Sequence, residues 1–212
     1  MLEKNIVSLE EENKALKAQI VLLKEQMKKL DEKVFDLYTI SQAGKVFTAT
    51  PDTTKLSEIL LSMIVERIKM DKIALLLFDK KAGVFKLTQA IGINIEETGQ
   101  IEYRPREGLF WQLIVSGEPF SVVDIEGNLR FSGIFNGSNL KLLNSSTWVP
   151  LKTKERVIGV ITLSKKEINH EDLDFLTQLA GQAAVAFETA LLYQELGAVS
   201  YTHLTLPTIY SV

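Results

Sequence analysis

Leucine recurs at every seventh position near the start of the chain, and an apolar or amide residue follows each leucine by four positions. The leucines are Leu2, Leu9, Leu16, Leu23, Leu30 and Leu37, and the residues between them are Ile6, Asn13, Ile20, Met27 and Val34. A 4-3 repeat of about five heptads is typical of a coiled coil. We therefore expect residues 1–40 to form a dimerisation helix with this set as its interface. The alternative is that the stripe packs on the chain's own globular part, although such stripes are usually wider.

The residue types in the repeat favour a parallel pair. Leucine at d with mostly β-branched residues at a is typical of two parallel strands. Asn13 occupies an a position, where two facing amides satisfy each other in a parallel dimer and penalise shifted registers. Glu12 at g would face Lys17 at e of the second copy. We expect a parallel homodimer.

Between residues 41 and 196 the pattern changes to alternating short helices and strands. Apolar spacing predicts an amphipathic helix over 56–68, with Asp52, Thr53 or Thr54 as its cap. A short helix is predicted at 107–117 and a long helix after Asn169. Strands are predicted at 73–78, 84–91, 120–125, 146–152 and 156–164, with loops at 92–106 and 126–145. This order predicts an α+β fold, an antiparallel sheet with helices on one face and at its edges.

The apolar positions of the last helix step 3-4-3-4-3, so this helix is also expected to continue a dimer seam. They are Leu173, Leu176, Ala180, Ala183, Phe187 and Ala190. After Gly197 the pattern stops, and VSYTHLTLPT (199–208) resembles an in-frame translation of a sequencing-library adapter. We therefore expect domain boundaries at 1–40, 41–196 and 197–212, a non-native tail in the last of these, and an output domain in the natural protein beyond Leu196. An ordinary disordered tail is the alternative.

Composition and charge narrow the classes of function. The net charge is -3, so there is no broad basic field for nucleic acid. No apolar run approaches the roughly 20 residues that span a bilayer, and the N-terminus is not a secretory signal. We expect a cytoplasmic protein without membrane or nucleic-acid partners. The absence of cysteine excludes disulfides, thiolate nucleophiles, cysteine zinc sites and thioether-linked chromophores. With only two histidines and no nucleophile–base pair, we expect no catalytic activity.

Three stretches of the globular part resemble the GAF domain family. They are ILLSMIVERIKMDKIALLLFDKKAG (59–83), REGLFWQLIVSGEPFSVVDI (106–125) and STWVPLKTKERVIGVITL (146–163). The third is the most specific, because it is similar to the family's VPL, charged turn and IGV hairpin. The resemblance covers residues of about 38–196. It implies an antiparallel sheet of about six strands with a ligand pocket beside it, in a module that regulates an attached output domain.

The resemblance also implies which ligands to consider. Family members commonly bind cyclic nucleotides, tetrapyrroles, haem or small metabolites, or serve only for dimerisation. Thioether attachment of a bilin and cysteine-dependent sulfoxide reduction both need a residue that this chain lacks. Haem would need an axial histidine, and His170 at the start of the last helix is expected to face solvent. The identity of any cofactor stays open.

If a ligand binds, its pocket would be lined by aromatic residues from the short helix, the long loop and the strand with VPL. The candidates are Phe110, Trp111, Phe131, Phe135 and Trp148, with Ser145, Ser146 and Thr147 as hydrogen-bond donors. Arg104, Arg106 and Arg130 would suit an anionic ligand. The alternatives are plain core packing for the aromatic residues and solvated loops for the arginines. Two functions follow: a sensor that binds a small molecule and dimerises to control an output domain, or a structural adaptor with an empty domain.

Overall fold

The computed structural model describes residues 2–93, 102–105, 108–121, 147–164 and 168–204. The chain divides into two compact units, Met1–Gln42 and Ala43–Val212. The helices are α1 (Leu2–Thr48), α2 (Thr53–Ile68), α4 (Gly108–Ser116) and α7 (His170–Leu204). The strands are β1 (Ile73–Asp79), β2 (Val84–Ile91), β3 (Glu102–Tyr103), β4 (Phe120–Ser121), β5 (Thr147–Lys152) and β6 (Val157–Leu163).

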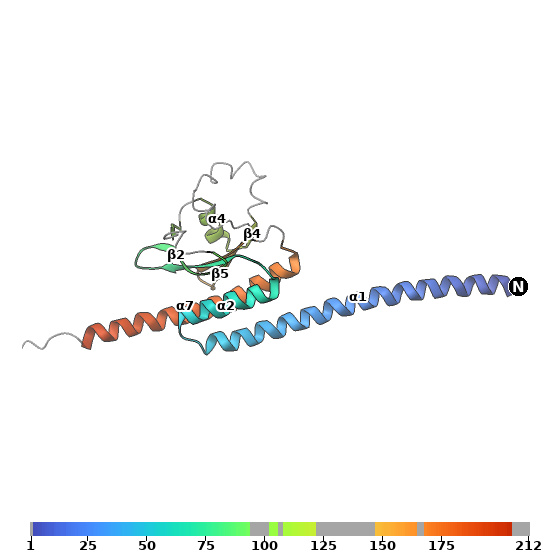
Figure 1. Ribbon diagram of the computed structural model, residues 1–212, viewed down its shortest axis with the longest axis horizontal. Coiled ribbons are helices and arrows are strands. Elements are labelled where there is room, and N and C mark those ends of the chain that lie inside the picture. The colour runs from blue at the N-terminus through green and yellow to red at the C-terminus, as the bar shows by residue number, and fades with distance from the viewer. Residues whose placement is uncertain (1, 94–101, 106–107, 122–146, 165–167, 205–212) are drawn as a thin grey trace, which may run out of the picture. The chain divides into compact units, whose positions relative to one another are not determined.

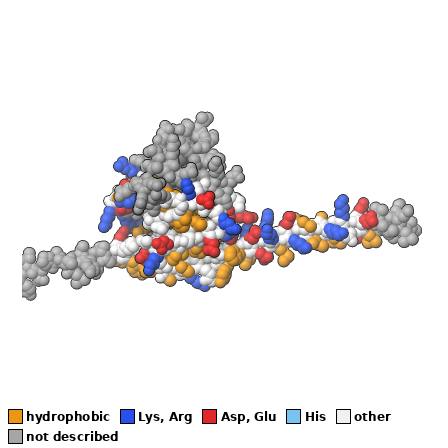
Figure 2. Space-filling model, in the orientation of Figure 1, with side chains coloured by type: hydrophobic (Ala, Val, Ile, Leu, Met, Phe, Trp, Pro, Cys, Tyr) orange, Lys and Arg blue, Asp and Glu red, His pale blue; other side chains and the backbone are white. Residues whose placement is uncertain are grey.

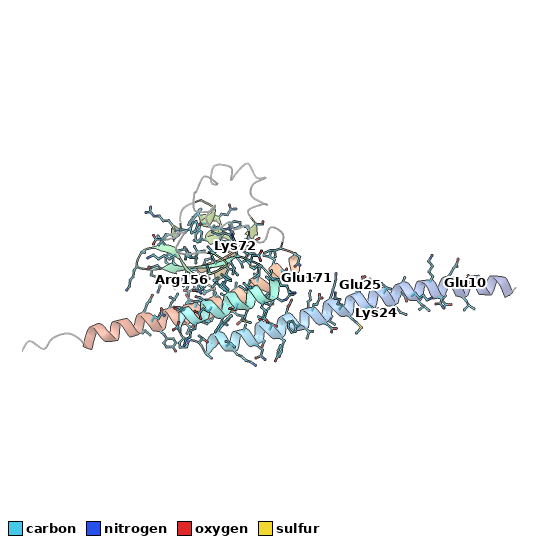
Figure 3. The ribbon with its side chains drawn as sticks, in the orientation of Figure 1. Glu10, Lys24, Glu25, Lys72, Arg156 and Glu171 are labelled. Atoms are coloured by element: carbon cyan, nitrogen blue, oxygen red, sulfur yellow. The ribbon has the colours of Figure 1, made fainter. Side chains whose placement is uncertain are left out.

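The first unit is a helical segment of α1 whose apolar stripe is exposed. Where side chains are described, the a and d residues from Leu9 to Leu37 are all exposed, and the apolar ones among them are 50–65% exposed. Figure 2 shows apolar side chains interleaved with charged ones along α1, and Figure 3 labels Glu10, Lys24 and Glu25 among the charged set. The long helix is as expected, and its pairing with a second copy stays a prediction.

The second unit is built on one six-stranded antiparallel sheet with the order β3-β2-β1-β6-β5-β4. The two predicted hairpins, β1–β2 and β5–β6, are both present, and they join through β1 and β6 at the centre. A register shift between Leu75 and Leu76 marks an irregularity in the first hairpin. The α+β class and the antiparallel sheet of about six strands are confirmed.

Helices cover both faces of this sheet (Figure 1). α2 and α7 pack on one face, where Leu75, Val149 and Ile161 are fully buried. α4 lies on the other face and contributes Phe110 and Leu113 to a second buried cluster. Because successive residues of a strand point to opposite faces, each central strand supplies both layers.

Caps and turns form where polar residues satisfy free backbone amides. The Asp52 carboxylate accepts hydrogen bonds from the amides of Thr54 (2.8 Å) and Lys55 (3.1 Å), as predicted for the start of α2. These bonds hold the pKa of Asp52 below its usual value. The Asn169 side chain caps α7 by accepting from the Asp172 amide at 2.6 Å. The local chemistry of the sequence therefore fixes both helix starts.

Three expectations for individual segments were wrong. Residues 92–106, predicted as loop, contain the short strand β3, which pairs with β2 at Phe85 and Tyr103. α7 does not stop at Gly197 but continues to Leu204. The expected dimer seam of α7 is instead core. Five of its residues are at most 1% exposed, because they pack inside their own domain: Leu176, Ala180, Ala183, Phe187 and Ala190.

The burial of this face also explains why α7 is so apolar. The segment His170–Leu196 is long and apolar enough to cross a membrane by length and composition, yet half of its apolar window is buried within the domain. A helix that supplies one side of a hydrophobic core passes the same test. Packing against the sheet therefore accounts for the buried half of this apolar window.

Candidate functional site

The sheet face that carries α4 holds a buried cluster rich in aromatic side chains. Its centre is formed by Phe85 from β2, Phe110 from α4 and Trp148 from β5, each at most 2% exposed. Tyr103 from β3 and Phe120 from β4 pack against it from the two edges of the sheet. The cluster therefore joins five separate elements, and we refer to it as the aromatic cluster.

The rings contact one another in defined geometries. Tyr103 stacks on Phe110, with ring centroids 5.2 Å apart and an interplanar angle of 4°. Trp148 is nearly perpendicular to both, with ring centroids 5.6 Å from Tyr103 (81°) and 5.8 Å from Phe110 (77°). Phe120 lies nearly parallel to Trp148 at 6.0 Å. Such arrangements are favourable beyond the burial of area alone.

Among the described residues, three polar side-chain atoms at this face are buried without a hydrogen-bond partner. They are the hydroxyl of Tyr103, the indole Nε1 of Trp148 and the hydroxyl of Thr162. Trp148 and Thr162 stand directly opposite each other on β5 and β6, so their side chains share one face. A buried unpaired polar group costs about 1–3 kcal/mol. An unfilled group of this kind in a folded protein calls for an explanation, and a ligand or bound water that accepts hydrogen bonds would provide one.

Burial also fixes the protonation of this site. Desolvation raises the pKa of Tyr103 well above its ordinary value, so the phenol remains protonated at physiological pH. The indole N–H of Trp148 is a donor only. The site therefore presents neutral hydrogen-bond donors between aromatic surfaces, which suits an acceptor group on a flat ligand.

The structure brings together some of the predicted site residues. Phe110 and Trp148 meet in the aromatic cluster, whereas Trp111, the next residue of α4, is 48% exposed on another side of that helix. Thr147 alternates with Trp148 along β5 and belongs to the opposite face. Phe131, Phe135, Ser145, Ser146, Arg106 and Arg130 lie outside the described residues.

Three contributors to the site were not predicted from sequence. Tyr103 lies in a segment that reads as loop, and a strand of two residues is too short to show alternation. Phe120 was expected in a strand but not in the pocket. Thr162 could have been found from the register of the predicted β5–β6 hairpin, because it pairs with Trp148.

Two observations concern the metal-binding residue types in the described part of the chain. No group of three His, Asp or Glu side chains there is placed to hold a metal ion. His170 is solvent-exposed, as expected, and its Nδ1 lies 3.1 Å from a carboxylate oxygen of Asp174. The candidate site is therefore the aromatic cluster.

A family model described as GAF domain matches residues 50–188 of this chain. Among curated proteins, diguanylate cyclase A of Treponema denticola is 26% identical over 185 residues, which cover 83% of this chain and 49% of that protein. Nitrogen fixation protein AnfA of Azotobacter vinelandii is 24% identical over 161 residues, which cover 74% of this chain and 30% of that protein. The chain thus spans at most about half the length of these relatives.

Solved structures share the fold at low sequence identity. The GAF domain of a phosphoenolpyruvate-protein phosphotransferase from Coxiella burnetii superposes with a TM-score of 0.61 and 18% identity, covering 76% of this chain and 96% of that one. The GAF domain of the corresponding Acinetobacter protein gives 0.57 and 17%, covering 82% and 98%. A free methionine-R-sulfoxide reductase from Neisseria meningitidis, solved with its substrate, gives 0.53 and 18%, covering 73% and 89%.

Proposed function

Because the chain belongs to the GAF domain family, whose members are generally sensory modules of signalling proteins, we propose that it senses a small molecule at the aromatic cluster and dimerises. The proposed role is regulatory rather than catalytic: the ligand would control an output domain in the complete protein. The relatives support this view, because a diguanylate cyclase and a nitrogen fixation protein both extend well beyond the matched region.

The unpartnered polar atoms of the aromatic cluster carry the ligand part of this proposal. Aromatic walls favour a flat ligand, and the donors of Tyr103, Trp148 and Thr162 favour one that accepts hydrogen bonds. The sulfoxide reductase of the same fold was solved with its substrate, although the absence of cysteine sets this chain apart from cysteine-dependent chemistry. The ligand is expected to bind without covalent attachment.

The two tryptophans of the chain provide a test of this site. In the variant Trp111→Phe, Trp148 is the single remaining tryptophan, so its fluorescence reports on the aromatic cluster. This variant is screened against a panel of nucleotides, nucleobases and aromatic metabolites, with the melting temperature as a second readout. A true ligand changes the emission of Trp148 and raises the melting temperature saturably.

Three aromatic variants locate the binding. Trp148→Phe and Tyr103→Phe should weaken binding of the identified compound, whereas Trp111→Phe should not, because Trp111 is exposed and outside the cluster. Loss of one net hydrogen bond corresponds to an affinity about 2- to 13-fold lower. Equal affinity in all three variants would place the ligand elsewhere.

The exposed apolar stripe of α1 carries the dimer part of the proposal. Isolated in water, such a row would be unfavourable, and a second copy would bury it in knobs-into-holes packing. α7 has a second exposed row with the same 4-3-4 spacing, formed by Val185, Thr189, Leu192 and Leu196. We propose that this row, rather than the buried one, extends the dimer contact.

Two adjacent leucines of α1 give a controlled test of pairing. Leu22 and Leu23 are 55% and 57% exposed in the single chain, but only Leu23 occupies a d position. Leu23→Lys should convert the dimer to monomer in analytical ultracentrifugation, whereas Leu22→Lys should leave the mass unchanged. Leu9→Cys in the cysteine-free chain should form an intermolecular disulfide if the helices are parallel and in register. A monomeric wild-type chain at high concentration would refute the dimer.

The packing of the aromatic cluster supports a second candidate, a structural dimerisation adaptor with an empty domain. The ring centroids lie 4.6–6.0 Å apart, so the rings pack directly against one another. In that case no compound in the screen changes Trp148 emission, while the dimer persists and depends on Leu23. The two experiments together therefore separate sensor from adaptor.

A further inference from the structure

A cleft opens where the ends of two hairpins meet the C-terminal part of α7. It has a volume of about 860 Å³, within the range of small-molecule sites. Its apolar lining comes from three strands and α7, namely Leu77, Phe78, Leu87, Ile158 and Leu191. Thr53, at the start of α2, lies at its edge.

The charged lining of this cleft has an excess of positive groups. Lys80, Lys81, Lys86 and Arg156 line it, against Asp79 and Glu195. Lys86 pairs with Asp79 at 2.9 Å, and the pKa values of both shift in favour of the charged forms, mainly through this contact. When that pair is set aside, Lys80, Lys81 and Arg156 remain in the lining, of which Lys80 pairs with Glu195 and Arg156 with Glu188.

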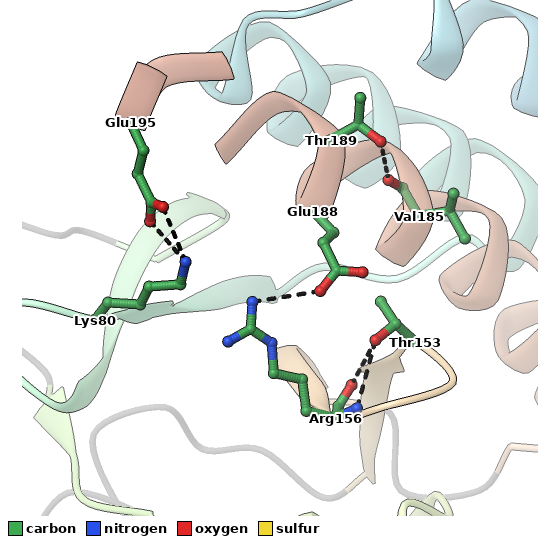
Figure 4. A network of polar contacts seen from close by, with 7 residues as sticks. All are labelled: Lys80, Thr153, Arg156, Val185, Glu188, Thr189 and Glu195. Atoms are coloured by element: carbon green, nitrogen blue, oxygen red, sulfur yellow. Dashed lines mark hydrogen bonds and ion pairs between the residues drawn. The ribbon is translucent and has the colours of Figure 1, made fainter. Parts of the chain in front are cut away.

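The remaining carboxylate, Glu195, belongs to α7 and bonds across the cleft. Its side chain lies 2.8 Å from Lys80 Nζ. Glu188, about two turns earlier in α7, lies 3.3 Å from Arg156 Nη2 (Figure 4). Both pairs are partly exposed, with Lys80 42% and Arg156 43% accessible. Exposed pairs of this kind contribute little to stability, so another anion can compete with them.

Polar contacts join the C-terminal part of α7 to the body of the domain. Fully buried positions of α7 end at Ala190, and residues 192–196 are exposed. Beyond that point the hydrogen bonds and ion pairs to the body among the described residues are Gln194 donating to the Thr53 hydroxyl at 3.0 Å and Glu195 pairing with Lys80. A ligand group that replaces Glu195 would therefore occupy the cleft and also remove one contact that holds the C-terminal part of α7 to the body.

We propose that this cleft is a binding site for a small organic anion with an apolar body, whose acid group takes the place of Glu195 on Lys80. The apolar floor holds the body, and Arg156 and Lys81 add positive charge at the rim. The proposal does not depend on a ligand in the aromatic cluster, although Phe78 and Leu87 line the cleft and also pack against that cluster.

Matched probes test the required chemistry. Octanoate combines an acid group with an apolar chain, octanol lacks the charge, and acetate lacks the apolar body. Calorimetric titration of the wild-type chain should show saturable binding of octanoate and none of octanol or acetate over the same range. Octyl phosphate in a separate arm shows whether phosphate esters are accepted as well as carboxylates. Absence of saturable binding of either eight-carbon anion would overturn the proposal.

The two members of the ion pair provide variants with opposite expected effects. Lys80→Gln removes the receptor of the acid group and should lower the octanoate affinity about three- to fivefold. Glu195→Gln removes its competitor and should raise the affinity by a similar factor. A purely structural ion pair would respond alike to either change, so effects of the same sign would overturn the proposal.

Three controls account for charge and location. Lys154→Gln and Glu171→Gln make the same changes in net charge at exposed positions outside the cleft lining, and both should bind octanoate as wild type does. Tyr103→Phe should also leave the affinity unchanged. If Tyr103→Phe weakened octanoate binding while Lys80→Gln did not, the anion would occupy the aromatic cluster and the cleft would not be its site.

Discussion

Replacement of Tyr103 by phenylalanine removes one hydroxyl and leaves its aromatic contacts in place. The ring would still stack on Phe110 and lie nearly perpendicular to Trp148. The hydroxyl is buried and has no hydrogen-bond partner, so the folded protein bears its desolvation cost of about 1–3 kcal/mol without compensation. The small void left behind offsets part of the gain. We expect Tyr103→Phe to stabilise the ligand-free domain by about 1 kcal/mol.

The assay is urea unfolding of dialysed, ligand-free protein in the Trp111→Phe background, followed by Trp148 fluorescence. The expected gain corresponds to a rise in melting temperature of about 2–4 °C for a domain of this size. Tyr193→Phe is the matched control, because Tyr193 is 63% exposed and its hydroxyl is already hydrated. This control should lie within about 0.5 kcal/mol of the parent.

Alkaline pH provides an independent check on the same hydroxyl. Because burial raises the pKa of Tyr103, the unfolded chain releases this proton before the folded domain does. Below the unfolded pKa of about 10 the group is protonated in both states, and as the pH rises further its ionisation in the unfolded chain lowers the stability of the domain. Tyr103→Phe should show a shallower loss of stability above pH 10 than the parent.

A destabilised Tyr103→Phe domain would refute this reasoning. If the variant lost 1 kcal/mol or more while Tyr193→Phe was neutral, the hydroxyl would have a partner in the folded protein. The argument for an acceptor-bearing ligand would then lose its main support.

Three further predictions concern the framework around the site. Gly159→Ala should lower the free energy of unfolding in urea by about 1–3 kcal/mol, because the new Cβ would lie 2.9 Å from the backbone oxygen of Leu76. Gly181→Ala in α7 should instead stabilise the domain by about 0.5–1 kcal/mol, because no atom lies within 4 Å of the new Cβ. Phe187→Ala should cost about 3–5 kcal/mol by the same measurement, and a cost below 1 kcal/mol would contradict its place in the core. Asp52→Asn keeps the cap of α2 but removes the carboxylate, whose pKa is lowered by the backbone amides of Lys55 and Thr54. The variant should therefore lose less stability than the parent as the pH falls below about 4. Identical unfolding profiles in acid would show that the cap is not charged.

Most of the sheet could be predicted because its hairpins carry strong local signals. The β1–β2 turn is closed by Asp79, whose side chain accepts from the amides of Lys81 and Ala82, and this chemistry is readable from the sequence. β3 could not be predicted, because two residues give no periodicity and their place depends on pairing with β2. Because β3 was not predicted, Tyr103 was not among the predicted site residues.

The site prediction failed where local pattern does not decide which side of an element faces inward. Phe110 and Trp111 are consecutive residues of α4, and a helix turns about 100° per residue, so only one of them faces the sheet. On α7, the buried row ending at Ala190 and the exposed row through Val185 and Leu192 both have heptad spacing. Only the position of the sheet determines which row is core and which is free for a partner.

β5 connects the proposed ligand site with α7. Trp148 points into the aromatic cluster, and the next residue, Val149, is fully buried on the face that packs against α7. Closely packed interiors transmit small displacements, so a ligand that shifts Trp148 also acts on the strand beneath α7. Such a ligand changes the exit of α7 only if it prefers one arrangement of that helix. The weak polar attachment of α7 beyond Ala190 makes that second arrangement accessible at small cost, because the exposed Lys80–Glu195 pair is a main part of what must be broken.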